Sequence, residues 1–162
     1  MKKELPKLYV ILLSIILFII SYFGFSKISD LLLPKVENVD FYTTNLRDSF
    51  LQNLYYSLII GITPIFIYGT WVISKIKNVT NRYLSIILVF MTMLTFILLR
   101  MEVLKLKFKN LPILESETGE IITHTFNIKN LNYEYFLLIG LISGCILCYL
   151  IFKSKVKKII NN

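Results

Sequence analysis

The chain has 162 residues, of which 56% are hydrophobic, and it carries a net charge of +8. A soluble domain of this length cannot bury so much apolar side chain in one core, so the composition excludes an ordinary soluble domain. No basic face interleaved with aromatic residues accompanies the positive charge, so we do not expect nucleic acid as a partner.

Four long apolar blocks separate the charged segments, and none of them contains Asp, Glu, Lys or Arg. A helix rises 1.5 Å per residue, so roughly 20 apolar residues cross the hydrocarbon core of a bilayer. Every backbone polar group is then bonded within its own helix. We therefore expect an all-α polytopic membrane protein, a single domain of residues 1–162 whose first partner is the lipid bilayer. Its transmembrane helices are predicted over residues 8–25, 54–74, 83–99 and 135–152.

The first apolar block follows Lys2 and Lys3, a pattern that also begins secretory signal peptides. Its apolar stretch is longer than the core of a signal peptide, and no small-residue cleavage pattern follows it. We therefore expect this block to be an uncleaved anchor helix.

Basic residues are distributed unevenly between the polar segments. Residues 1–7, 75–82 and 153–162 together hold ten basic residues and one acid, whereas the two longer segments hold eight basic residues and nine acids. Short loops rich in Lys and Arg stay on the cytoplasmic side of a membrane. We therefore expect both termini and the middle loop in the cytoplasm (or on the matrix side of an organelle), with residues 26–53 and 100–134 outside.

The first exterior segment contains a short apolar run, Ile28–Leu33, which Pro34 ends. We expect this run to lie along the membrane surface. Further on, Thr44, Asn45 and Asp48 are candidate capping residues, which would allow the second helix to begin before its apolar block.

The second exterior segment is predicted to form a β-hairpin over residues 103–129. Apolar and polar residues alternate over residues 104–109 and again over residues 122–128, and Thr118–Gly119 is a turn signal between them. Alternation with a period of two is typical of half-buried strands. A lone hairpin is marginal in water, so its apolar side would need the membrane surface or a partner.

Few residues of the chain are suited to catalysis or to metal binding. His124 is the only histidine and is interpreted as a side chain on a strand face, because no second ligand lies near it. Cys145 and Cys148 form a C-x-x-C inside the fourth apolar block, where thiolates are disfavoured, so we interpret them as small packing residues. We expect no enzyme activity, no metal and no cofactor.

Small residues in the fourth block predict close helix packing. Gly140 and Gly144 form G-x-x-x-G, and Cys148 continues the same face one turn later. Such faces let two helices approach closely. In the second block, Pro64 lacks a backbone N–H and is expected to kink the helix.

The second block also carries a recognisable spacing. Pro64, Tyr68 and Trp71 form P-x-x-x-Y-x-x-W. Upstream, Glu4–Lys7 precedes the first helix, and Ser29–Pro34 reads S-D-L-L-L-P. In this order, over about residues 1–100, these segments resemble TatC, the receptor subunit of the twin-arginine protein translocase.

The resemblance implies a cytoplasmic N-terminus and a role in guiding folded substrates without catalysis. TatC binds the arginine pair of a signal peptide with acidic residues of its N-terminal segment and first cytoplasmic loop, and here Glu4 would have that role. The sequence also departs from the family: TatC has six spanning helices, and residues 74–82 contain neither its P-G-L turn nor its E-R pair. The alternative hypothesis is a small structural or accessory subunit of another membrane complex, docked through its hairpin, so other membrane subunits are expected partners.

Overall fold

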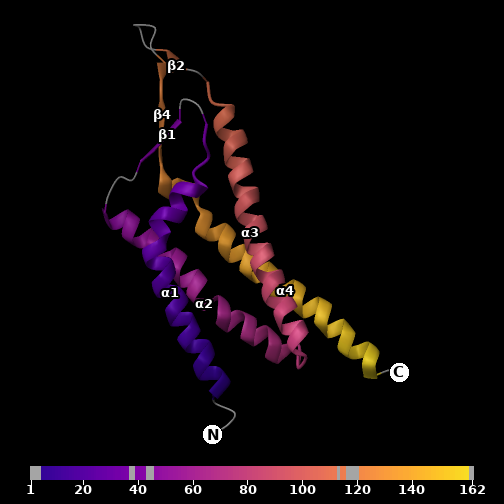
Figure 1. The fold of residues 1–162 in the computed structure, drawn as a ribbon. Coiled ribbons are helices and arrows are strands. Elements are labelled where there is room, and N and C mark those ends of the chain that lie inside the picture. Colours follow the sequence, from indigo (N-terminus) through magenta and orange to yellow (C-terminus); the bar gives the residue numbers. More distant parts are fainter. Residues whose placement is uncertain (1–4, 37–38, 43–45, 113, 116–120, 161–162) are drawn as a thin grey trace.

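The protein is a bundle of long helices that carries small β-structure at one end, as Figure 1 shows. The computed structural model describes residues 5–36, 39–42, 46–112, 114–115 and 121–160. Its helices are α1 (Leu5–Leu32), α2 (Leu46–Ile73), α3 (Val79–Lys109) and α4 (Tyr133–Ile160), with a 3₁₀ turn, η1, at Ile128–Leu131. The four α-helices are long and apolar enough to cross a membrane, in agreement with the four predicted spans.

The helices associate as two pairs, and one helix of each pair contacts the other pair. Helix α1 packs along α2, α3 packs along α4, and α2 contacts α4. Only 11% of the span in α1 is buried inside the protein, compared with 44% of the span in α2. Helix α1 therefore presents most of its apolar surface outward. Lipid hydrocarbon can cover this surface, because all backbone groups in the span are hydrogen-bonded within the helix. Both chain ends lie at one end of the bundle, which we call the terminal end.

The opposite end, which we call the sheet end, carries two short sheets (Figure 1). Strand β1 (Val39–Tyr42) pairs in parallel with β4 (His124–Asn127), so that Val39 lies opposite His124. Strands β2 (Leu114–Glu115) and β3 (Ile121–Ile122) form a small antiparallel pair. The parallel pair joins the two long connections of the chain, one before α2 and one after α3.

The predicted hairpin over residues 103–129 is wrong in its first arm. Helix α3 continues through these residues to Lys109, well beyond its apolar block. Leu104 and Phe108 lie one helical turn apart and are 2% and 5% exposed, whereas Leu106 is 63% exposed. Leu104 and Phe108 therefore lie on one buried face of a helix. A helix forms all its backbone hydrogen bonds within itself, so this segment needs no partner strand.

The second predicted arm is partly correct. Residues 124–127 do form a strand, but its partner is β1, a strand that was not predicted from the sequence. Helix α1 extends to Leu32, so the run Ile28–Leu33 continues the first helix for most of its length. Helix α2 begins at Leu46, the early start expected for it, whereas the candidate caps Thr44 and Asn45 lie outside the described residues.

Candidate functional site

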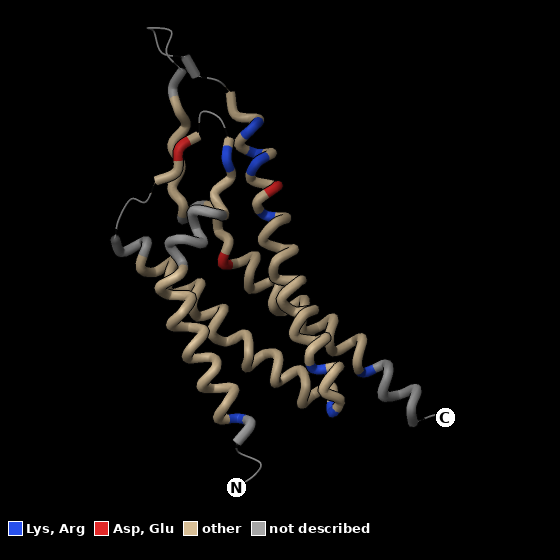
Figure 2. The backbone as a smooth tube through the Cα atoms, viewed as in Figure 1, with Lys and Arg blue, Asp and Glu red and all other residues tan. Residues whose placement is uncertain are grey.

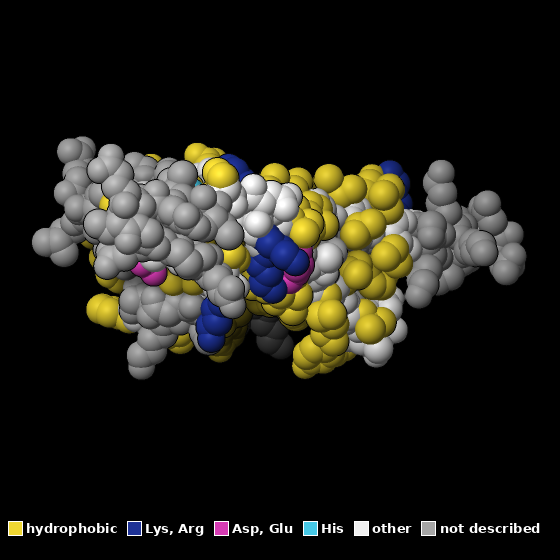
Figure 3. All heavy atoms as spheres, turned by 90° about the horizontal axis from the view of Figure 1, so that it is seen from above, with side chains coloured by type: hydrophobic (Ala, Val, Ile, Leu, Met, Phe, Trp, Pro, Cys, Tyr) yellow, Lys and Arg dark blue, Asp and Glu magenta, His cyan; other side chains and the backbone are white. Residues whose placement is uncertain are grey.

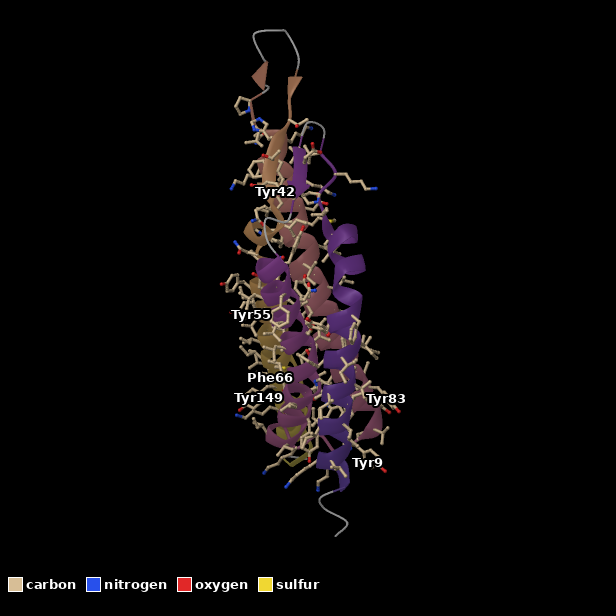
Figure 4. All side chains as sticks on the ribbon, turned by 90° about the vertical axis from the view of Figure 1, so that its left-hand side faces the viewer. Tyr9, Tyr42, Tyr55, Phe66, Tyr83 and Tyr149 are labelled. Atoms are coloured by element: carbon tan, nitrogen blue, oxygen red, sulfur yellow. The ribbon has the colours of Figure 1, made fainter. Side chains whose placement is uncertain are left out.

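Charged and aromatic side chains mark the two ends of an apolar band. Figure 2 shows basic residues at the terminal end of the helices and charges of both signs at the sheet end. In Figure 4, Tyr9, Tyr83 and Tyr149 lie toward the terminal end, and Tyr55 and Tyr42 lie toward the sheet end. Tyrosines favour the two membrane–water interfaces, since the ring is apolar and the hydroxyl is hydrated. The stretch of helix between these groups is therefore the part suited to hydrocarbon.

An aromatic cluster supports the β1–β4 sheet at the sheet end. The ring of Phe108, on the last turns of α3, lies 5.5 Å from the ring of Phe41 and 4.8 Å from that of Phe126, measured between centroids. Beside the sheet, His124 Nε2 donates to the carbonyl of Pro112 at 2.8 Å. His124 is thus a side chain of a strand, and the described residues contain no group of three potential metal ligands.

The two strands present one face to the helix and one outward. Val39 and Phe41 are half-buried, whereas Asp40, Tyr42 and Thr125 are exposed. Within the described residues neither strand has a second partner, so each has an outer edge. Seen from above in Figure 3, basic and acidic side chains lie next to one another, and Lys105 Nζ donates to Glu102 Oε1 at 2.6 Å on the outside of α3.

Two hydrogen bonds fix the chain where the connections meet the helices. Arg100 Nε donates to the carbonyl of Leu131 at 2.9 Å, and its guanidinium lies 5.0 Å from the centre of the Phe136 ring. The hydroxyl of Tyr133 donates to the carbonyl of Leu32 at 2.6 Å. A carbonyl in the last turn of a helix has no partner within that helix, so Tyr133 satisfies one at the end of α1.

A cavity of about 500 Å³ lies between α2 and α4 just below the sheet end. Glu134, in the first turn of α4, lines this cavity, and its Oε2 is buried without a hydrogen-bond partner among the described residues. Gln52 of α2 lines it from the other side and is 7% exposed. The remaining lining residues are Leu51, Tyr55, Leu58, Ile59, Asn132, Tyr135 and Leu138. The cavity therefore combines apolar walls with one carboxylate and two amides, those of Gln52 and Asn132.

At the terminal end, a polar cluster ties three helices together. Trp71 Nε1 donates to Ser85 Oγ at 2.5 Å, and Ser85 Oγ donates to the carbonyl of Arg82 at 2.7 Å. The guanidinium of Arg82 lies 5.4 Å from the centre of the Trp71 ring. Cys148 Sγ, on α4, lies 3.5 Å from the carbonyl of Ser85. Trp71 of the predicted motif is therefore a packing residue between α2 and α3.

The glycine pair of α4 lies against α3 of the same chain. A Cβ atom at Gly140 would lie 2.7 Å from Met93 Cα, and one at Gly144 would lie 2.9 Å from Val89 Cα. Thr92 Oγ1 donates to the carbonyl of Gly140 at 3.2 Å across this contact. The close approach of the two backbones therefore depends on the missing side chains.

The other residues selected from the sequence are scattered through the protein. Pro64 lies inside α2, whose helix continues on both sides of it. Glu4 lies outside the described residues. Cys145 and Cys148 are free thiols, and Cys148 is fully buried. None of the selected residues that the structure describes lines the cavity.

Sequence reasoning missed Glu134 because it directly precedes the uncharged block 135–152 and was counted among the exterior acids. The pattern that could have indicated it is an acidic residue directly before a long apolar block, because acidic residues favour the first turn of a helix. Gln52 gave no signal, because a single polar residue before an apolar block is ordinary on a loop.

The fold and these sites define a class: a multi-pass integral membrane protein with two small sheets at one end of its helices. The chain matches no protein-family model, and no curated protein or solved structure is significantly similar to it.

Proposed function

We propose that the protein is a non-catalytic structural subunit of a multi-subunit membrane complex, and that it binds another subunit through the β1–β4 sheet. The observation that carries the proposal is a parallel sheet of only two strands among the described residues. Parallel strands in folded proteins normally belong to larger sheets that are covered on both faces. A partner that supplied a strand or a cover would complete this one.

The chemistry of the sheet suits the addition of a strand. An outer edge offers unpaired backbone N–H and C=O groups, to which an extended segment of another chain can pair. The aromatic cluster around Phe108 covers the inner face and holds the strands in place. On the outer face, Asp40, Tyr42 and Thr125 would contact the side chains of the added segment.

The test uses a photo-crosslinking amino acid in the native host. Placed at Tyr42 or Thr125, it should capture one discrete membrane protein, and placed at Lys77, at the terminal end, it should not. The same capture from all three positions, or from none, would reject docking through the sheet. Deletion of the captured protein's gene should abolish the crosslinked product.

A second candidate is a component of a protein translocase similar to TatC. It is supported by the spacing of Pro64, Tyr68 and Trp71 in α2, where the rings of Tyr68 and Trp71 lie 6.4 Å apart between centroids. In this role both termini would lie in the cytoplasm, and Glu4 would bind arginine side chains through charge-assisted bonds. The chain should then be required for export of a folded reporter behind a twin-arginine signal. Unimpaired export after depletion, in a host with no other receptor copy, would reject this role.

A further inference from the structure

The cavity between α2 and α4 lies where two candidate membrane spans approach the sheet end. Glu134 is the second residue of α4, so it lies at the very start of a predicted membrane span. Two tyrosines at the rim, Tyr55 and Tyr135, are 53% and 61% exposed. Leu58, in the span of α2, is 44% exposed beside them. Because these residues belong to candidate membrane spans, lipid of the surrounding bilayer can reach the cavity.

The carboxylate at the cavity wall has one oxygen that no described residue contacts through a hydrogen bond. Oε2 of Glu134 is buried and has no hydrogen-bond partner among the described residues. The positive charge of Arg100 acts on Glu134, but the guanidinium directs its Nε–H to the carbonyl of Leu131 and its face to Phe136. A buried charge is costly unless it is paired and hydrogen-bonded. The cavity is therefore electrostatically suited to a small cation that carries N–H groups.

We propose that this cavity is a binding site for the primary ammonium headgroup of an ethanolamine phospholipid. The ammonium group donates hydrogen bonds to Glu134, and the amide of Gln52 is available to the adjoining phosphate. Leu51, Leu58 and Leu138 provide apolar wall for the glycerol and the start of the acyl chains. The bilayer supplies such headgroups at high local concentration, so even a weak site is occupied.

The chemistry distinguishes this lipid from its neighbours. A choline headgroup has the same charge but no N–H donor, and its three methyl groups require a larger site. A glycerol headgroup leaves the lipid anionic and would meet the carboxylate with repulsion. Selectivity should therefore follow the number of N–H groups on the headgroup rather than the charge of the lipid.

The test measures the melting temperature of the purified full chain in detergent to which defined phospholipids are added. Phosphatidylethanolamine should raise it by about 3–6 °C above phosphatidylcholine, the shift expected for a lipid at roughly ten times its Kd. The mono- and dimethylated headgroups should give intermediate shifts. Equal shifts across this series would overturn the proposal, and since the series uses the wild-type chain, that result does not depend on any variant folding.

Two variants locate the effect. Glu134→Gln should abolish the difference between the ethanolamine and choline lipids, and native mass spectrometry should show loss of the retained ethanolamine lipid. Glu102→Gln is the matched control, because Glu102 is an exposed acid on α3, paired with Lys105 and away from the cavity. If Glu134→Gln keeps the preference for the ethanolamine lipid, the preference arises at another surface and the proposed site is wrong. Free ethanolamine at the same concentration should give no shift, and a shift equal to that of the lipid would reject a phospholipid as the ligand.

Discussion

Trp71 and Ser85 form a hydrogen bond of 2.5 Å that joins α2 to α3 at the terminal end of the bundle. The indole N–H is a donor only, and Ser85 is 1% exposed, so no water replaces this contact. The same serine oxygen donates to the carbonyl of Arg82, whose guanidinium lies over the indole ring. Side chains of both helices therefore hold the ends of α2 and α3 together at the turn between them.

Removal of this bond should destabilise the bundle. Trp71→Phe keeps most of the ring but leaves Ser85 without its donor, and we expect a loss of about 1–3 kcal/mol in the free energy of unfolding. Chemical denaturation in detergent measures it. Tyr83→Phe, which removes a hydroxyl from an exposed side chain near the start of α3, is the control and should change little.

The contact between α3 and α4 should not tolerate a methyl group at Gly144. Gly144→Ala places a Cβ 2.9 Å from Val89 Cα, so the helices must separate, at a cost of about 1–3 kcal/mol. Gly69→Ala is the matched control, since no atom lies within 4 Å of a Cβ there and alanine favours the helix. Equal melting temperatures for the two variants would show that the glycine contact contributes nothing.

Truncation of Phe108 should release the sheet from the helix. Phe108→Ala removes the ring that contacts Phe41 and Phe126, and burial of a large aromatic is worth about 3–5 kcal/mol. Hydrogen exchange at the amides of β1 and β4 should then accelerate, while exchange in the spans of α2 and α4 stays slow. Leu106→Ala, at an exposed position of the same helix, should leave the sheet protected.

The orientation of the chain can be tested with single cysteines. Because basic residues concentrate at the terminal end, we expect Thr125→Cys to react with an impermeant reagent in intact cells and Lys77→Cys to react only after lysis. Both positions are exposed, so accessibility to water does not differ between them. The opposite labelling pattern would invert the proposed topology. Both backgrounds require replacement of Cys145 and Cys148 by alanine.

The number and position of the spans could be predicted from the sequence, because long uncharged apolar blocks have one physical solution in a bilayer. The end of α3 could not, because Leu104, Leu106 and Phe108 fit a strand and Leu104 and Phe108 also fit a helix. The pattern alone could not show whether these residues are more stable in a continuous helix, which needs no partner, or in a new hairpin.

The β1–β4 pairing and the cavity were beyond sequence reasoning for a different reason. Val39 and His124 meet only because the end of α1 lies beside the start of α4, and no local pattern in a four-residue strand encodes that partner. Glu134 and Gln52 likewise become neighbours of one cavity only after α2 and α4 pack. The Gly140–Gly144 spacing did predict close packing, since two small residues one turn apart on one helix face let another helix approach closely.

The parallel β1–β4 pair imposes an order on biogenesis. Strand β1 leaves the ribosome early, directly after the first helix, yet its partner is synthesised only after α2 and α3. The two strands can meet on the same side only when both intervening helices have crossed the membrane. Closure of the sheet is thus a late event with a high loop-closure cost, and it reports that insertion of α2 and α3 is complete. A chain stalled before His124 would leave β1 without its partner strand.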